Sequence, residues 1–323
     1  MILEPRTLEE LQRSLKAANA TGEPVDSVRL GMLNRLMDHV PADMTATVEA
    51  GMTLAQFQQR LAAQGQWLPL DPPNSDHLAL GDLLSTNTSG PRRFGYGTVR
   101  DYLLGIRVAL ADGRLIRAGG KVVKNVAGYD LCKLFVGSHG TLGVIVEATF
   151  KLRPIPEAEQ FVQAEFDSVE QADALIQAIL ESDLAPVVLD LHNLQTFRVS
   201  RSDAPRPHAW TLVLGFAGAR EDVAYQVAKA GELGARTPSN LDHETRFWNA
   251  DTIGPTRRSS VLSSELAKTI QGLGRVAMVA RAGNGIIWYR GGPEPPKADR
   301  PEKLIRRVKE TFDPKRIFPE LPL

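Results

Sequence analysis

The chain has 323 residues, with 38 Lys and Arg against 38 Asp and Glu, and one cysteine. This length predicts about two domains, and the ordinary composition excludes collagen and wholesale disorder. The zero formal net charge disfavours a nucleic-acid-binding protein that relies on phosphate contacts. The lone Cys132 excludes an internal disulfide and a metal site built from several cysteines. The sequence has no run of about 18 apolar residues and no secretory start, so we expect a cytoplasmic protein.

The N-terminal part of the sequence predicts two capped helices with a strand between them. Thr7 with Glu10, and Thr53 with Gln56, have the spacing of capping boxes, in which each side chain satisfies a free backbone N–H of the helix start. Leucines follow at helical spacing in both segments. A strand is expected over 45–50, so this part mixes helix and sheet.

A hairpin is the next regular structure that the sequence predicts. Residues 104–110 and 114–118 read as strands, and Asp112-Gly113 between them fits a type I′ turn. A further strand is expected over 142–152.

Residues 71–100 differ from the segments around them. From Leu80 to Gly97 the chain is dense in Gly, Ser, Thr and Asn, which predicts irregular backbone. Small residues let a backbone approach a flat or phosphorylated ligand closely, and hydroxyl and amide groups supply the few polar contacts of a cofactor site. Spacing alone leaves a binding segment and plain loops equally open.

The second half predicts a separate domain that begins near Pro154 and Pro156. A strand, a helix, two strands and a helix are expected over 160–166, 168–181, 186–193, 209–216 and 220–232. This order suggests a ferredoxin-like sheet with helices on one face. A hairpin over 275–290, a Pro-rich linker over 293–301 and a last helix that ends at Phe312 complete the chain.

Four sequence blocks, in this order, carry a resemblance to a known family. The chain resembles the FAD-binding domain of the vanillyl-alcohol oxidase and p-cresol methylhydroxylase (PCMH) superfamily, and within it the FAD-binding subunits of bacterial glycolate oxidases. The resemblance is strongest over about 45–152. The blocks are Gly90–Arg93, Gly97–Asp101, Val123–Leu131 and Gly140–Ile145.

The resemblance implies an α+β fold with a two-lobed PCMH-type FAD-binding domain and a ferredoxin-like cap domain. The FAD-binding domain would cover 1–153 with a shortened first lobe, and the cap would cover 154–292. Residues 293–323 would form a C-terminal helix and tail that return to the FAD-binding domain.

The resemblance also implies a cofactor and a reaction. FAD would accept a hydride from a 2-hydroxy acid within a glycolate oxidase-like complex, beside a catalytic FAD-containing paralogue and an iron–sulfur subunit. The complex would be cytoplasmic, or held at the inner membrane through these partners. No catalytic side chain and no metal site is assigned. The residues expected along FAD are Pro72, Leu80, Gly81, Ser85, Asn87, Ser89, Gly90, Gly97, Val99, Gly140, Gly143 and Ile145.

Three departures from the family pattern leave an alternative open. The Gly-rich loop that binds the FAD diphosphate in the first lobe is missing between Gly22 and Leu36, and a second family glycine is replaced by Asp82. The tail over 312–319 lacks the family's Asn-Pro-Gly-Arg. A diphosphate needs backbone N–H donors and is repelled by a carboxylate, so the chain could instead be a cofactor-poor structural subunit that docks the catalytic paralogue.

Several further side chains are singled out by their type. Lys124, Asn125, Tyr129 and Asp130 would either tie a loop to the core or contact flavin, and Arg92 and Arg93 would form a solvated or subunit-facing surface or bind a carboxylate. Cys132 is expected in the core and His139 in a surface turn. For His192 and His208 the sequence indicates no Arg or His partners.

Overall fold

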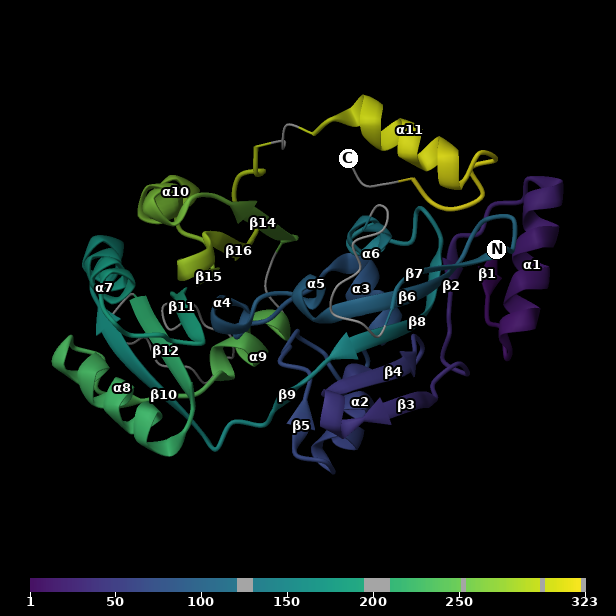
Figure 1. Cartoon of the computed structure of the whole chain (residues 1–323). Helices are drawn as coiled ribbons and strands as arrows, with labels where there is room; N and C mark the ends of the chain where they lie inside the picture. The colour runs from purple at the N-terminus through teal and green to yellow at the C-terminus, as the bar shows by residue number, and fades with distance from the viewer. Residues whose placement is uncertain (121–129, 195–209, 251–253, 297–299, 321–323) are drawn as a thin grey trace. The chain divides into compact units, whose positions relative to one another are not determined.

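The computed structural model describes residues 1–120, 130–194, 210–250, 254–296 and 300–320, and the chain divides into two compact units. The first unit consists of Met1–Ser89, Thr98–Ile155 and Asp299–Leu323, and the second of Gly90–Gly97 and Pro156–Ala298. Both units combine helices with sheets (Figure 1), so the α+β fold class is confirmed. Gly90–Gly97 belongs to the second unit, although the segments before and after it belong to the first. The contiguous domain boundaries inferred from the sequence do not predict this.

The first unit is built on a five-stranded antiparallel sheet of order β3-β4-β8-β6-β7. Its strands are β3 (Leu36–Val40), β4 (Thr45–Glu49), β6 (Leu103–Ala109), β7 (Leu115–Gly119) and β8 (Val144–Lys151). Two small sheets pair β1 (Ile2–Leu3) with β2 (Ser27–Val28), and β5 (Gln66–Trp67) with β9 (Arg153–Pro154). The strand expected over 45–50 and the first hairpin are confirmed.

Two helices of the first unit, α1 (Leu8–Thr21) and α2 (Leu54–Ala62), begin at the threonine caps that the sequence predicts. This unit also contains η1 (Pro41–Asp43), α3 (Leu80–Thr86), α5 (Val99–Tyr102), α6 (Leu131–Phe135) and α11 (Glu302–Phe312). The Thr7 hydroxyl accepts a bond from the Glu10 N–H, and Thr53 and Gln56 bond reciprocally as a capping box. Both predicted helix starts are confirmed.

Two local predictions in this unit are wrong. In the hairpin turn, Gly113 has a φ of +81° while Asp112 is not left-handed, which excludes a type I′ turn because that type needs positive φ at both residues. Leu110 and Arg114 close a three-residue loop instead. The segment from Leu80 onwards is also not wholly irregular, since it begins with α3.

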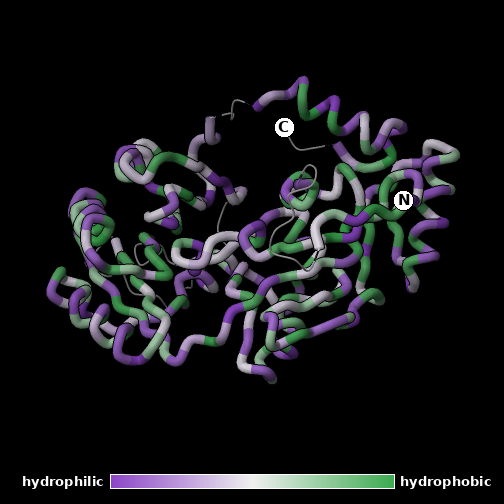
Figure 2. The backbone as a smooth tube through the Cα atoms, in the orientation of Figure 1, coloured by the Kyte–Doolittle hydropathy of each residue, from purple (hydrophilic) through white to green (hydrophobic). Residues whose placement is uncertain are grey.

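The C-terminal segment with α11 belongs to the first unit (Figure 1). The buried Lys309 side chain of α11 fastens it there. Its ammonium donates to the Thr141 carbonyl at 2.9 Å, to Asp313 Oδ2 at 2.7 Å and to the Phe318 carbonyl at 3.0 Å. Along α11, hydrophobic residues recur among hydrophilic ones (Figure 2), and their spacing is that of an amphipathic helix.

The second unit contains a seven-stranded sheet of order β13-β10-β12-β11-β15-β16-β14. Its strands are β10 (Ala158–Phe166), β11 (Val188–His192), β12 (Trp210–Gly218), β13 (Thr237–Pro238), β14 (Thr256–Ser260), β15 (Met278–Arg281) and β16 (Ile286–Arg290). The helices are α4 (Arg93–Tyr96), α7 (Val169–Glu181), α8 (Arg220–Glu232), α9 (Asp242–Trp248) and α10 (Leu266–Leu273), with η2 (Ser263–Glu265) and η3 (Ala282–Asn284).

The first four strands of this sheet have ferredoxin-like topology. In chain order they are β10, β11, β12 and β13, and they stand in the spatial order fourth, first, third, second, with α7 and α8 as the connecting helices. Apolar residues of β10, β11 and β12 form one core cluster with residues of α7, α8 and α10. The ferredoxin-like prediction is confirmed, and the hairpin β15-β16 extends the sheet on one side.

Candidate functional site

The first unit contains a cavity of about 630 Å³, which lies within the ~300–1,000 Å³ typical of small-molecule sites. We call it the glycine-lined cavity. It is formed by the chain around β2, the turn before α2, the start of α3 and the turn that leads into β8. Its lining residues are Val25–Gly31, Ala50, Gly51, Thr53, His77, Ala79, Gly81, Asp82, Ser85, His139, Gly140, Gly143–Ile145, Phe318 and Pro319.

This cavity gathers five of the residues that the family resemblance singles out. They are Gly81, Ser85, Gly140, Gly143 and Ile145. The other candidates of the first unit do not line it; these are Pro72, Leu80, Asn87, Ser89 and Val99. Gly90 and Gly97 belong to the second unit.

Two backbone hydrogen bonds fix the turn that forms one wall of the cavity. The His139 N–H donates to the Ser85 carbonyl at 2.8 Å, and the Gly137 N–H donates to the Leu84 carbonyl at 3.0 Å. His139 and Gly140 are left-handed, with φ of +53° and +72°. Glycine suits position 140 because residues with a Cβ adopt this left-handed conformation at a cost in free energy.

The space beside two glycines tests whether a ligand could lie here. A Cβ placed on Gly31 or on Gly140 meets no other heavy atom within 4 Å, so both glycines face open space. A flat or phosphorylated ligand can therefore approach the backbone closely at two walls. In size and in this close approach, the cavity fits part of a flavin nucleotide.

Around the start of α3, the charge and the hydrogen bonds are less suited to an anion. The N–H groups of Leu80 and Gly81 already donate to the carbonyls of Met52 and Ala50, at 2.9 and 2.8 Å. Asp82 keeps an exposed side chain, yet partial burial by the surrounding atoms raises the pKa of its carboxyl above the ordinary value. The loss of a glycine at this position thus adds an acidic group to the cavity.

The wall over 25–31 takes the place in sequence where the family has its Gly-rich loop. Its charged side chains are bound to the N-terminal segment: Arg29 to Glu4 at 2.9 Å, and Asp26 to the Met1 ammonium at 2.9 Å. Such exposed pairs contribute little stability. They nevertheless direct the Arg29 guanidinium toward Glu4.

In the second unit, strand alternation separates an apolar face from a polar one. Leu189 and Leu191 of β11 belong to the core beneath the helices. Successive side chains of a strand point to opposite faces, so Asp190 and His192 lie on the other face. The prediction that His192 lacks Arg or His partners is wrong in part, since its ring stacks on that of His243 with centroids 4.9 Å apart.

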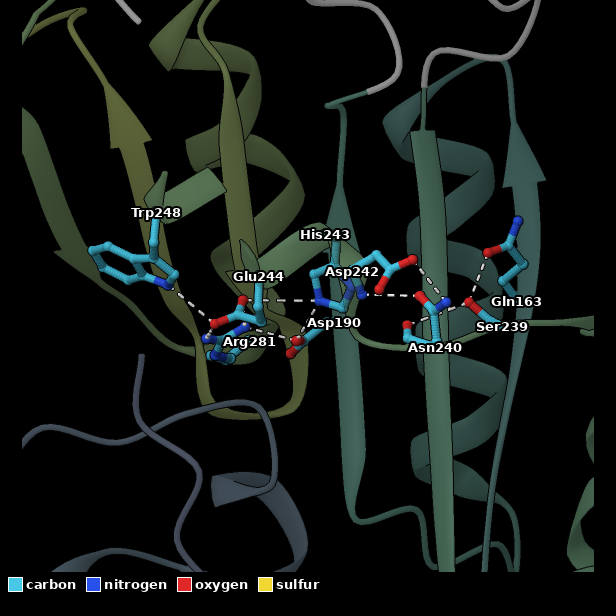
Figure 3. A network of polar contacts seen from close by, with 9 residues as sticks. All are labelled: Gln163, Asp190, Ser239, Asn240, Asp242, His243, Glu244, Trp248 and Arg281. Atoms are coloured by element: carbon cyan, nitrogen blue, oxygen red, sulfur yellow. Dashed lines mark hydrogen bonds and ion pairs between the residues drawn. The ribbon is translucent and has the colours of Figure 1, made fainter. Parts of the chain in front are cut away.

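Burial disfavours the charged form of the His192 ring. Burial, followed by the nearby His243 and Arg246, lowers the pKa of His192 well below its ordinary value. His243 Nε2 lies 3.0 Å from Asp190 Oδ2, and Asp190 also binds Arg281 at 2.6 Å (Figure 3). His192 is therefore next to a charged network that joins β11, α9 and β15.

Other predicted side chains have structural roles. Arg92 is largely buried and makes a two-pronged ion pair with Glu159, at 2.6 and 2.7 Å, so it binds a carboxylate of its own unit rather than forming a solvated surface. Asp130 caps α6 by accepting from the Lys133 N–H. Cys132 is buried as expected. Lys124, Asn125, Tyr129 and His208 lie outside the described residues.

Within the described ranges, none of the helices combines the length and the apolar character that crossing a bilayer requires.

Two protein-family models match the chain, one mostly over the first unit and the other mostly over the second. Residues 26–119 match the FAD binding domain, and residues 155–251 match the C-terminal domain of FAD linked oxidases. The chain thus contains segments that match two domains of FAD-linked oxidases. Its first unit carries the PCMH-type FAD-binding fold of these oxidases, and the match to a C-terminal domain covers much of the ferredoxin-like unit.

Curated relatives of the family include two glycolate oxidase subunits. The chain is 35% identical over 167 residues to "Glycolate oxidase subunit GlcD" of Bacillus subtilis, covering 52% of this chain and 36% of the relative. It is 37% identical over 153 residues to "Glycolate oxidase subunit GlcE" of Escherichia coli, covering 47% and 43%. It thus spans less than half the length of these relatives.

A third relative and a solved structure extend the comparison. A "D-lactate dehydrogenase" of Archaeoglobus fulgidus is 33% identical, covering 53% of this chain and 43% of the relative. The solved structure of an alkyldihydroxyacetonephosphate synthase superposes with a TM-score of 0.74 over 98% of this chain and 76% of the other, at 19% identity. This last likeness establishes the fold alone.

Proposed function

We propose that the chain is the FAD-binding subunit of a cytoplasmic, glycolate oxidase-like complex, with FAD in the glycine-lined cavity. The observation that carries the proposal is that Gly81, Ser85, Gly140, Gly143 and Ile145, which the family resemblance assigns to FAD, line one cavity. The similarity to two glycolate oxidase subunits supports the substrate class. Its partners would be a catalytic FAD-containing paralogue and an iron–sulfur subunit.

The side chains of the cavity have distinct roles in this proposal. Gly31 and Gly140 admit a ligand close to the backbone. The Ser85 hydroxyl donates to the Asp82 carbonyl at 3.1 Å, so its oxygen remains an acceptor for a ligand donor. FAD, when bound, would supply the two-electron acceptor for oxidation of a 2-hydroxy acid.

The direct test is the flavin content of the purified full-length chain. We expect a visible flavin absorbance band, or a saturable change in FAD fluorescence when FAD is added to the colourless protein. A folded chain that neither carries nor binds FAD, alone or co-purified with its partners, would refute the proposal.

Asp82 gives a sharper, pH-dependent version of this test. Protonation removes the carboxylate charge that opposes the FAD diphosphate, and burial raises the pKa of Asp82. FAD affinity should therefore increase as the pH falls through that pKa. Asp82→Asn should bind FAD about fivefold more tightly at neutral pH, which corresponds to ~1 kcal/mol for two charges about 4 Å apart in water, and should lose this pH dependence.

A matched control for Asp82 is Asp43→Asn in η1, since Asp43 is exposed and does not line the cavity. This control should leave both the FAD dissociation constant and its pH profile unchanged. Equal effects of the two substitutions would show that general surface charge, rather than Asp82, governs binding.

A second candidate function is favoured by the acidic group and the occupied N–H donors at the start of α3. In this alternative the chain holds no FAD and docks the catalytic paralogue and the iron–sulfur subunit. The two functions differ in one measurement. An active, iron-containing complex whose flavin content is fully accounted for by the paralogue would favour the structural subunit.

A further inference from the structure

A buried cluster of charged side chains in the second unit has no part in the proposed function. We call it the Arg281 cluster; it consists of Asp190, His243, Glu244 and Arg281 (Figure 3). Asp190 is 0% exposed, Arg281 3% and His243 5%. Burying several ionisable groups costs free energy unless opposite charges compensate them at close range. We therefore consider which charges compensate one another in this cluster.

Three members of the cluster have the composition of a metal-ligand set. Asp190 and Glu244 each offer a carboxylate oxygen and His243 offers a ring nitrogen, and these three atoms lie within 4.8 Å of one another. Two carboxylate oxygens and one imidazole nitrogen are suitable ligands for Zn²⁺ and related divalent transition ions, which also bind at sites with three protein ligands and an open position.

The fourth member, Arg281, already supplies a positive charge at this point. Its Nη1 atom donates to Asp190 Oδ2 at 2.6 Å and to Glu244 Oε1 at 2.7 Å, which are oxygens that a metal would use. Its Nη2 atom donates to Glu244 Oε2 at 2.7 Å. Arg281 therefore bridges the two carboxylates as a single divalent ion would.

The cluster also resembles a metal site in its surroundings. Trp248 Nε1 donates to Glu244 Oε2 at 3.0 Å, so the carboxylate is held by a neighbour outside the ligand set, as ligands of metal sites commonly are. The second oxygen of Asp190, Oδ1, is buried and has no hydrogen-bond partner among the residues that the structure describes. The cluster thus retains an unused ligand atom that the guanidinium does not reach.

We propose that Asp190, His243 and Glu244 form a set of divalent-metal ligands, and that the Arg281 guanidinium takes the place of the metal ion in the wild type. The wild-type cluster therefore takes no metal ion. Replacing Arg281 by a small neutral residue opens the site to Zn²⁺ or Co²⁺. This inference does not depend on FAD binding in the other unit.

The test compares Co²⁺ binding by the full-length wild type and by Arg281→Ala. Co²⁺ bound by nitrogen and oxygen ligands gives visible d–d absorbance, so occupancy is read directly. We expect one equivalent to bind to Arg281→Ala and none to bind at the cluster of the wild type. Zn²⁺ should displace the Co²⁺ and raise the Tm of Arg281→Ala, with no change for the wild type.

A double variant shows whether the ion lies in this cluster. Adding Asp190→Asn to Arg281→Ala should weaken Co²⁺ binding by at least about tenfold, because a charged ligand is lost. Arg281→Lys is the charge-conserving control, and it should bind no Co²⁺. Co²⁺ binding by the wild type that Asp190→Asn abolishes would overturn the proposal.

The remaining outcomes are also decisive. Folded Arg281→Ala that binds no Co²⁺ would overturn the proposal. If Arg281→Ala does not fold without metal, Zn²⁺ should restore its far-ultraviolet circular dichroism. If Arg281→Ala stays unfolded in Zn²⁺, Arg281→Gln, which leaves less space, replaces it in the Co²⁺ titration. Folded Arg281→Gln that binds no metal would then overturn the proposal.

Discussion

Cys132 shows how burial controls the chemistry of a single side chain. It is 7% exposed, and burial, together with the nearby Asp130 carboxylate, raises the pKa of its thiol to about 11. The thiolate is the reactive form. Around neutral pH, almost all of this thiol is therefore protonated in the native protein. A protonated, buried thiol is suited to packing in the core rather than to catalysis.

We therefore expect Cys132 to react slowly with a thiol reagent such as a disulfide dye. At pH 8 the native protein should react at least about 100-fold more slowly than the protein in denaturant, where the pKa returns to ~8.5. The chain has one cysteine, so the signal is unambiguous. Equal rates in the two states would contradict the burial argument.

Gly51 is a second residue whose environment permits a matched experiment. A Cβ on Gly51 would lie 1.8 Å from the Leu30 carbonyl oxygen and 2.7 Å from that of Leu33. Gly51→Ala should therefore displace this wall of the cavity, lower the unfolding free energy by about 1–3 kcal/mol or more, and weaken FAD binding. Urea unfolding and an FAD titration measure both effects.

The control for this experiment is Gly31→Ala on the same cavity. Gly31 faces open space, so its substitution should change the unfolding free energy by no more than about 0.5 kcal/mol. If both variants lose the same stability, the close packing of Gly51 against Leu30 does not explain the need for glycine.

At the scale of secondary-structure elements, capping makes a testable contribution to α2. The Thr53 hydroxyl accepts from the Gln56 N–H at 3.3 Å, and the Gln56 side chain accepts from the Thr53 N–H at 3.2 Å. Thr53→Ala should reduce the unfolding free energy by about 1 kcal/mol, whereas Thr53→Ser should retain most of it. Urea unfolding midpoints measure the difference, and equal losses would exclude the hydroxyl as the cause.

The same helix explains which elements could be predicted from sequence. Thr53 and Gln56 are three residues apart, so the signal that begins α2 is local. The residues Asp112-Gly113 alone predict the wrong turn type. The loop also depends on the hydrogen bond from the Leu110 N–H to the Arg114 carbonyl, which lies outside this pair.

Of the two candidate sites, the sequence indicates residues of the glycine-lined cavity but not the Arg281 cluster. Gly140 lies in one of the sequence blocks that resemble a known family, and the same resemblance assigns Gly81 to the cofactor. In the Arg281 cluster, Asp190 is 53 residues from His243 and 91 residues from Arg281. Only the pairing of β11 with β15 and the packing of α9 bring these residues together, so no sequence spacing could indicate the cluster.

At the scale of the whole molecule, the two units should respond differently to FAD. The glycine-lined cavity lies within the first unit. FAD should therefore slow amide hydrogen exchange in α3 and over 139–146, because a bound ligand stabilises the segments that it contacts. Strands β11 and β12 of the second unit should exchange at unchanged rates.

Hydrogen exchange measured by mass spectrometry, with and without FAD, tests this expectation. Asp43→Asn should give the same pattern as the wild type. Protection that appears in β11 and β12 but not in α3 would show that the glycine-lined cavity is not the place where FAD binds.

The hydrogen bonds by which Lys309 holds the C-terminal segment to the first unit have a consequence for synthesis on the ribosome. The Val25 N–H donates to the Ile317 carbonyl at 2.7 Å, and Lys309 binds the Thr141 carbonyl, so early and late parts of the chain complete one unit. A nascent polypeptide that has just emerged through residue 155 still lacks these partners. The second unit is therefore translated before Phe318 and Pro319, which line the glycine-lined cavity. If FAD binds in this cavity as proposed, the complete binding site forms only after both units have been synthesised.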